Sequence, residues 1–184
     1  MTIALPLTFG GWQIIFADPP WRFASNSKAK PGRNAMRHYE CMTFKELQAL
    51  PVAEIAAPVS LLCMWVTVPF AEHGYQLSRE WGFKPVSQLV WPKQRIATGY
   101  WARNRHEFII IAKRGRFPCE RPALFSDSVI PGDQRDHSRK PEWPQEQIDK
   151  RFPNMRKLEL FARRPRAGWQ VMGNETEKFE GIGQ

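Results

Sequence analysis

The chain has 184 residues, of which 42% are hydrophobic and 24% are charged. This balance excludes a disordered chain and is typical of one soluble domain with a sizeable core. Lysine and arginine number 27 against 18 acidic residues, a net charge of +9. A surplus of that size favours a polyanionic partner, because Coulomb attraction and counterion release both reward contact with phosphates.

The cysteines and the apolar stretches point to a cytoplasmic protein. Three cysteines are too few and too scattered for a disulfide framework, which fits a reducing compartment. The chain shows no charged start followed by an apolar signal core. Its most apolar stretch, residues 55–71, is interrupted by proline, serine and threonine and is too short for a membrane-spanning helix. We therefore expect no membrane association.

Alternating apolar runs and helical patterns predict the secondary structure. In chain order they predict a strand over 13–17, a helix over 43–50, a strand over 60–68, a helix over 70–81, strands over 86–91 and 107–112, a helix over 144–152, and strands over 157–161 and 169–172. Thr43 and Glu46 have the spacing of a capping box, and Gly82 is a helix-ending residue. The pattern predicts a single α/β domain over 1–184 with a mostly parallel sheet, a core at about 12–175 and a polar tail over 176–184.

Three long polar loops interrupt this pattern, over residues 22–37, 92–105 and 118–139. Loops of that length in a compact domain bind a ligand or are disordered. Two of them are basic. The cations that we expect to contact a nucleic-acid backbone, because their loops flank strand ends, are Lys28, Lys30, Arg33, Arg37, Arg95, Arg103 and Arg105.

The first predicted strand ends in Asp18-Pro19-Pro20-Trp21. Ligands of open α/β sheets bind at the carboxyl ends of strands. The two prolines have fixed φ and no N–H, so they make a stiff corner that projects a carboxylate and backbone carbonyls beside an indole. Acceptors next to an aromatic face suit a flat ligand with an amino group, such as the exocyclic amine of a base.

This motif and the sequence after it resemble the MT-A-seventy (MT-A70) family of adenine N6-methyltransferases. The similarity runs from about Trp12 to Glu175, in the family's order. The segments that carry it are DPPW, HYECMTFKEL, LLCMWVT, EWGFKPVSQLVWPK, GYWARNRHEFIIIAKRG, HSRKPE and RKLELFARRPRAGWQVMGNE. The resemblance implies a class I Rossmann-like methyltransferase fold in which the catalytic motif precedes the cofactor motif. It also implies S-adenosyl-L-methionine as cofactor.

The resemblance assigns roles to individual residues. It implies that Asp18 and the Pro19 carbonyl accept hydrogen bonds from the adenine amino group, with Pro20 completing the corner. Trp21 and Tyr39 would lie against the base. The residues that match cofactor-binding positions are Asp18, Lys140, Phe161, Arg163, Asn174 and Glu175. No metal is expected, because a sulfonium already carries an activated methyl group.

Acceptors on the amino hydrogens explain the motif chemically. The amino lone pair of adenine is delocalised into the ring, so its nitrogen is a poor nucleophile. Acceptors make it more nucleophilic and place negative charge where positive charge develops in the transition state. A base within a duplex must be extruded, or presented single-stranded, to reach such a site.

The chain departs from the family at two positions. No acidic residue precedes Asp18, so the cofactor-binding aspartate that some members have ahead of the first strand is missing. Where the eukaryotic enzyme has Asn-Gln, this chain has Asn174-Glu175. A carboxylate can still accept hydrogen bonds from ribose hydroxyls.

The sequence leaves the substrate and the biological setting open. The single-domain format resembles bacterial or phage members, so we expect DNA as substrate, with RNA as the alternative. A catalytically silent nucleic-acid-binding scaffold and a cytosine N4-methyltransferase are two further hypotheses. A homodimer is also compatible with the abundant tryptophan.

Overall fold

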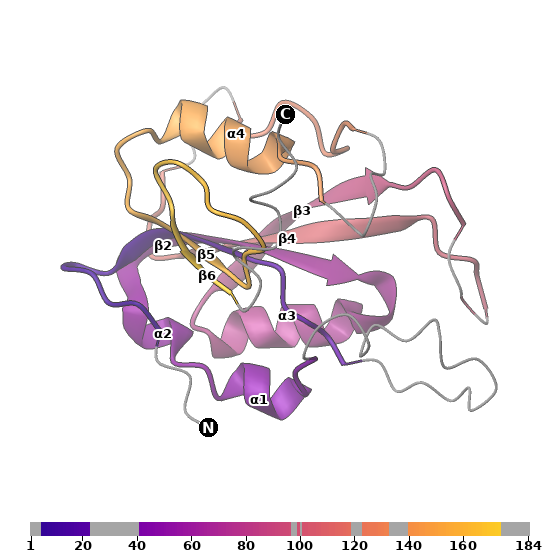
Figure 1. The fold of residues 1–184 in the computed structure, drawn as a ribbon, viewed down its shortest axis with the longest axis horizontal. Helices are drawn as coiled ribbons and strands as arrows, with labels where there is room; N and C mark the ends of the chain where they lie inside the picture. The colour runs from indigo at the N-terminus through magenta and orange to yellow at the C-terminus, as the bar shows by residue number, and fades with distance from the viewer. Residues whose placement is uncertain are drawn as a thin grey trace.

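The computed structural model describes residues 5–22, 41–96, 99, 101–118, 123–132 and 140–173. Within these residues the strands form one six-stranded sheet in the order β3-β4-β2-β1-β5-β6 (Figure 1). The strands are β1 (Trp12–Ala17), β2 (Ala56–Thr67), β3 (Lys84–Pro92), β4 (His106–Arg114), β5 (Lys157–Leu160) and β6 (Gln170–Met172). Each strand predicted from the sequence is therefore confirmed, although β2 begins earlier than expected.

The sheet is parallel around β1 and antiparallel at one edge. The parallel pairs are β1 with β2, β1 with β5, and β5 with β6. β4 runs antiparallel to both β2 and β3. Among the described residues of the connection from β3 to β4 there is no helix, and the two strands pair as an antiparallel hairpin. The chain builds β2, β3 and β4 on one side of β1 and then returns to β5 on the other side. The strand order therefore reverses at β1, the kind of position where open α/β sheets bind ligands.

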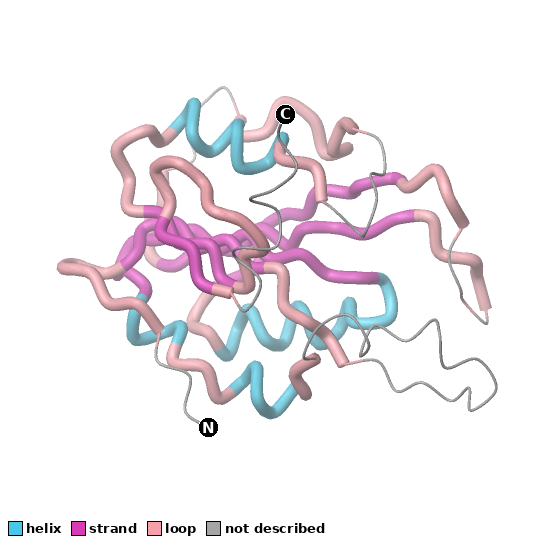
Figure 2. The backbone as a smooth tube through the Cα atoms, viewed as in Figure 1, coloured by secondary structure: helices cyan, strands magenta, loops and turns pink. Residues whose placement is uncertain are grey.

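Helices cover both faces of the sheet. α4 (Trp143–Arg151) lies on one face, and α1 (Phe44–Gln48), α2 (Val52–Ile55) and α3 (Ala71–Glu80) lie on the other (Figures 1 and 2). A short 3₁₀ turn, η3 (Val68–Phe70), leads into α3. This arrangement confirms the predicted Rossmann-like α/β fold. The sequence did not predict α2, because four residues after a proline are too few to show a helical period.

The predicted helix ends are confirmed in detail. The Thr43 side chain accepts the Glu46 N–H, and the Glu46 carboxylate accepts the Thr43 N–H at 2.7 Å, which completes the capping box. At the end of α3, Gly82 has φ +83°. Its N–H donates to the Arg79 carbonyl, and the Phe83 N–H donates to the Ser78 carbonyl. These two bonds make a Schellman motif, which requires a left-handed residue at this position.

Two hydrophobic cores sandwich the sheet. Alternate strand residues point to opposite faces, so Ile15 and Leu62 join the core under α1 and α3, whereas Ile14 and Cys63 join the core under α4. Most of the tryptophans belong to these cores; the buried ones are Trp12, Trp21, Trp65, Trp81, Trp91 and Trp169. In the described part of the chain, none of the helices has the length and apolar character needed to span a bilayer.

Candidate active site

The carboxyl ends of β1, β2 and β5 meet at one edge of the sheet. The register pairs Ala17, the last residue of β1, with Met64 of β2 and Leu160 of β5. Because β4 is antiparallel to β2, its first residues lie at the same edge, and Glu107 pairs with Thr67. The residues that follow β1 and β5 therefore gather beside the start of β4.

The Asp18-Pro19-Pro20-Trp21 corner is fixed by backbone hydrogen bonds on both sides. The Asp18 N–H donates to the Leu160 carbonyl at 3.3 Å, and the Trp21 N–H donates back to the Pro19 carbonyl at 2.9 Å. The Pro20 carbonyl accepts the Met42 N–H, also at 2.9 Å. The corner is thus held against β5 and, through the bridge between Trp21 and Met42, against the segment that precedes α1. The prolines prevent it from continuing the strand.

Lys140 holds the Asp18 carboxylate. Its Nζ donates to Oδ1 and Oδ2 of Asp18, both at 3.0 Å. The same Nζ lies 3.3 Å from Oε2 of Glu107, and Lys93 pairs with the other oxygen of Glu107. The four side chains are between 12% and 21% exposed. They form an alternating row, Asp18–Lys140–Glu107–Lys93, which we call the charge row.

The charge row shifts the ionisation of its central members. Burial alone would lower the pKa of Lys140, but the Asp18 and Glu107 carboxylates outweigh burial and hold that pKa above its ordinary value. Burial would likewise raise the pKa of Glu107, but Lys140 and Lys93 hold it below the usual range. Both groups are therefore charged at neutral pH, and each has two oppositely charged neighbours that offset the cost of its burial.

The Trp21 indole is buried in the core under α1 and α3. It stacks on Phe70 with ring centroids 5.3 Å apart and an interplanar angle of 15°. Its Nε1 donates to the Trp65 carbonyl at 3.4 Å, and the Lys140 ammonium lies 5.4 Å from the centroid of the Trp65 ring. Phe70 covers one face of Trp21, so a base that stacks on this indole has only the opposite face to use. The base contact of Trp21 stays a prediction.

The chain leaves β5 through a strained residue. Phe161 has φ +64°. Among the described residues, it is the one residue other than glycine that has a positive φ. Such a conformation costs about 1–3 kcal/mol and is concentrated at functional sites. A Cβ on Gly173 would lie 2.0 Å from the Ala162 carbonyl oxygen, so only glycine permits the approach of β6 to this segment. Arg163 lies near enough to Lys140 that its positive charge acts to lower the pKa of Lys140, against the effect of the two carboxylates.

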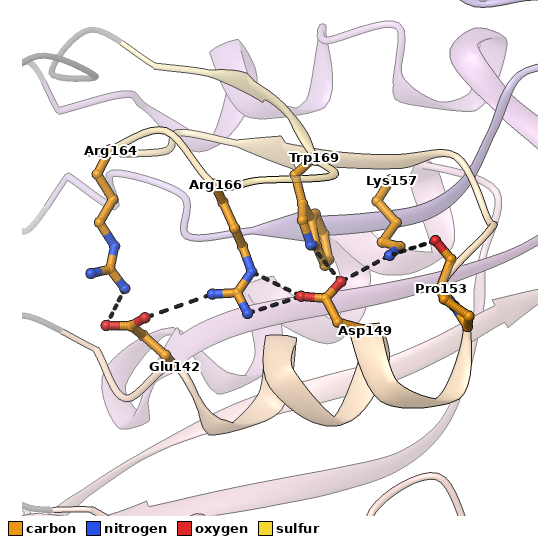
Figure 3. A network of polar contacts seen from close by, with 7 residues as sticks. All are labelled: Glu142, Asp149, Pro153, Lys157, Arg164, Arg166 and Trp169. Carbon is orange, nitrogen blue, oxygen red and sulfur yellow. Dashed lines mark hydrogen bonds and ion pairs between the residues drawn. The ribbon is translucent and has the colours of Figure 1, made fainter.

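Asp149 on α4 fixes the loop between β5 and β6 (Figure 3). Its carboxylate accepts hydrogen bonds from Lys157 Nζ at 2.8 Å, from Arg166 Nε and Nη2 at 3.1 and 2.9 Å, and from Trp169 Nε1 at 2.8 Å. Burial opposes ionisation of Asp149, but these donors outweigh it and lower the pKa of the carboxyl. The segment that follows Phe161 is therefore tied to α4 by charge-assisted bonds.

Two buried donors at this edge have no hydrogen-bond partner among the described residues. They are the Nε1 of Trp65 and the hydroxyl of Thr67, near the end of β2. Buried polar groups in native proteins are nearly always satisfied, by protein, water or ligand. Their position beside the Asp18 corner is consistent with a site that receives a polar ligand.

The MT-A70 family model matches residues 12–175. The chain belongs to the MT-A70 family. It is 31% identical over 180 residues to a Mycoplasma protein named type II methyltransferase M.MunI, covering 89% of this chain and 77% of that protein.

Eukaryotic MT-A70 relatives match over a similar part of this chain. An Arabidopsis thaliana protein named N(6)-adenosine-methyltransferase MT-A70-like is 31% identical over 91% of this chain, and human METTL3, named as a catalytic subunit, is 27% identical over 91%. The chain spans only 24% and 29% of the length of those two proteins.

The structure brings together part of the site predicted from the MT-A70 resemblance. Asp18, Lys140, Phe161 and Arg163 lie around the corner after β1. Arg95, Arg103 and Arg105 are exposed on the connection from β3 to β4. Several predicted residues lie outside the described residues: Lys28, Lys30, Arg33, Arg37, Tyr39, Asn174 and Glu175.

Glu107, whose position beside His106 suggests a place at the border of the site, is not among the predicted site residues. Its signal was a carboxylate at the first position of the predicted strand 107–112, which is otherwise apolar and where a packing role is unfavourable. Recognising this role required the antiparallel direction of β4, which alone brings the start of that strand to the ligand edge.

Proposed function

We propose that this protein transfers a methyl group from S-adenosyl-L-methionine to N6 of adenine in DNA. The observation that carries the proposal is the Asp18-Pro19-Pro20-Trp21 corner at the end of the central strand β1. There a carboxylate and a backbone carbonyl stand at the point where the strand order reverses. Membership of the MT-A70 family supports this chemistry, because the relatives are named as methyltransferases. We further propose that the chain forms a single catalytic domain.

The residues at the sheet edge fit the cofactor. The Lys140 ammonium, with Arg163 nearby, is a suitable partner for the carboxylate of S-adenosyl-L-methionine. Phe161 presents a half-buried ring in a strained conformation directly after β5, which suits contact with a planar base. The unpartnered donors of Trp65 and Thr67 add polar groups at the same edge. When bound, the cofactor supplies an electrophilic methyl group on a sulfonium.

The protein's contribution would be orientation and charge. Asp18 and the Pro19 carbonyl would accept the two amino hydrogens of adenine and so increase the nucleophilicity of its nitrogen. The Pro19 oxygen already accepts the Trp21 N–H, which fixes its direction and leaves a second lone pair. The stiff corner keeps both acceptors in place, so the nitrogen can be aligned with the methyl group. Asp18 acts here as an acceptor, without a need to become protonated.

One observation favours DNA over RNA. The chain covers 77% of the Mycoplasma type II methyltransferase but only about a quarter of the plant and human N6-adenosine methyltransferases. It therefore matches most of a type II methyltransferase and only one part of the other two proteins. The exposed arginines between β3 and β4 offer contacts to a phosphate backbone, which DNA and RNA share.

The test uses cofactor with a labelled methyl group, the purified protein, and DNA and RNA of mixed sequence. We expect label in DNA, recovered as N6-methyladenine after hydrolysis to nucleosides. Label only in RNA would transfer the proposal to RNA, and N4-methylcytosine would contradict adenine as the target. A wild-type protein that labels neither polymer would contradict the enzyme and favour a nucleic-acid-binding scaffold.

Asp18→Asn tests the role of the corner. The amide replaces an acceptor oxygen with an N–H donor that opposes the amino group, so we expect turnover to fall about 10²–10³-fold. Cofactor affinity, measured by calorimetry, should change less. Asp127→Asn, the same chemical change on an exposed loop residue, is the matched control and should leave turnover unchanged. Equal turnover of Asp18→Asn and the wild type would remove Asp18 from the mechanism.

A further inference from the structure

One tryptophan differs from the others in its surroundings. All eight tryptophans lie within the described residues; six are buried and Trp143 is half-buried, whereas Trp101 is fully exposed. Single exposed aliphatic residues are common on protein surfaces, but a fully exposed indole is unusual because tryptophan is highly buried on average. We therefore take the exposed Trp101 side chain as a candidate contact for a binding partner.

Trp101 lies on the connection from β3 to β4, at the same edge of the sheet as Asp18. The Lys93 N–H donates to the Arg105 carbonyl at 2.7 Å and closes the base of this connection. Lys93 is also the outer member of the charge row, which leads through Glu107 and Lys140 to Asp18. The described residues next to the two strands, 93–96 and 101–105, extend outward beyond the ends of β3 and β4, at the right of Figure 2. A molecule that reaches Asp18 with one group can thus contact Trp101 with another.

The residues around Trp101 carry positive charge. From Lys93 to Arg105, both included, the sequence has four basic residues and no acidic one, and Arg95, Arg103 and Arg105 are exposed. Ile96 adds a second exposed apolar side chain. An aromatic ring among cations is the combination that binds nucleic acids, because bases stack on the ring and phosphates pair with the cations. A second copy of this chain would bring like charges together at the same surface, which is unfavourable.

A close backbone approach constrains the position of Trp101. A Cβ on Gly99 would lie 1.9 Å from the Ala102 carbonyl oxygen, so only glycine permits this close approach next to Trp101. A close backbone contact beside Trp101 favours a wedge, because a wedge must enter a base stack without folding back.

We propose that Trp101 inserts into the base stack of duplex DNA and fills the place that adenine leaves when it is extruded toward Asp18. The inference rests on the proposed function and specifies its substrate as double-stranded DNA. Extrusion of a base costs stacking and pairing, and an indole stacked in the gap offsets part of that cost. The arginines beside Trp101 hold the backbone while the base leaves.

The first test measures DNA binding without catalysis. Binding of a labelled duplex of about 20 base pairs is followed by fluorescence anisotropy at several salt concentrations for the wild type, Trp101→Ala, Trp101→Tyr and Arg95→Ala. Stacking contributes enough that Trp101→Ala should weaken binding about 5- to 100-fold with an unchanged salt slope, and Trp101→Tyr should restore most of the affinity. Arg95→Ala should instead reduce the salt slope by about one unit. Phe9→Ala, at another fully exposed aromatic residue, precedes β1 at the opposite edge and should change neither quantity.

The second test examines extrusion. The methylated site is first mapped on plasmid DNA with the wild type, and duplexes are then made with that adenine either paired or opposite an abasic position. We expect Trp101→Ala to methylate the paired duplex more slowly than the wild type and the unpaired adenine at a similar rate. Equal loss on both substrates would overturn the wedge, as would a Trp101→Ala variant that binds and methylates like the wild type.

The outcomes separate this inference from the proposed function. If the wild type methylates DNA and Trp101→Ala matches it, only the wedge is wrong. If the wild type methylates nothing, the proposed function fails, and the anisotropy series still reports whether Trp101 stacks on DNA. A shift from dimer to monomer in Trp101→Ala on sedimentation, with unchanged DNA affinity per chain, would assign Trp101 to an interface between copies and overturn the wedge.

Discussion

Replacing Lys140 with methionine would measure how strongly the charge row depends on its central cation. The change removes the ammonium and keeps most of the aliphatic stem. Lys140 makes two bonds of 3.0 Å to Asp18 and an ion pair of 3.3 Å to Glu107. Removal of one partner from a buried pair costs about 3–5 kcal/mol. Asp18 retains 21% exposure and Glu107 keeps Lys93, so we expect the free energy of unfolding to fall by about 2–4 kcal/mol at pH 7.

Urea denaturation followed by circular dichroism measures this loss, with an unchanged dependence on urea as evidence that the denatured state is the same. Lys150→Met, at an exposed position on α4, is the matched control and should change the free energy by less than about 0.5 kcal/mol. Glu107→Gln added to Lys140→Met should recover part of the loss, because it removes one of the carboxylates left without its cation. Coupling of about 1–3 kcal/mol between the two substitutions is expected for groups in direct contact.

The pH dependence of the same variants gives an independent check. The pKa of Glu107 is below its usual value in the folded protein, so its contribution to stability is present above pH 4.5 and is lost as the pH falls. The difference between the wild type and Lys140→Met should therefore narrow in acid. A loss below about 0.5 kcal/mol at pH 7, or additive effects of Lys140→Met and Glu107→Gln, would refute the charge row as a coupled unit.

Two further predictions concern the segments around β5 and β6. Burial raises the pKa of Glu159 to about 7, so the folded protein holds a proton that the unfolded chain releases near pH 4.5, and stability should fall by about 3 kcal/mol as the pH rises through this window. Glu159→Gln should flatten this fall in urea titrations at pH 5 and 8, and an unchanged pH profile would contradict a buried, protonated Glu159. Gly173→Ala should force β6 away from Ala162, because the new Cβ would lie 2.0 Å from a carbonyl oxygen. Calorimetry should then show weaker cofactor binding, and binding equal to that of the wild type would show that this approach is not needed.

Local signals in the sequence predicted the elements well. Thr43 and Glu46 form their capping box, and Gly82 ends α3, because these interactions depend on residues close together in the chain. The direction of β4 was not visible in the same way, since an apolar run looks alike in parallel and antiparallel strands. Because β4 is antiparallel to β2, its first residues lie at the ligand edge, and this places Glu107 in the site.

Polar contacts between residues far apart in the chain could not be predicted from the sequence either, because they depend on how the elements pack together. Asp18 and Lys140 are 122 positions apart, and the resemblance placed Lys140 near the cofactor without indicating its bonds to Asp18. The ties from Asp149 to Lys157 and Arg166 likewise depend on how α4 packs on the sheet. Charged residues on a polar helix such as α4 usually face water, so no pattern in the chain separates Asp149 from its exposed neighbours.

The contacts of Lys140 with two carboxylates lead to a prediction about cofactor binding. An ammonium has three N–H donors; two go to Asp18, and the Glu107 carboxylate lies 3.3 Å away. A cofactor carboxylate that binds Lys140 must compete with both acidic residues, and its success would release an Asp18 oxygen for the adenine amino group. Removing the competing charge with Glu107→Gln should therefore tighten cofactor binding in calorimetry, whereas Lys140→Met should weaken it. Weaker binding in both variants would mean that Glu107 positions Lys140 for the cofactor instead of competing with it.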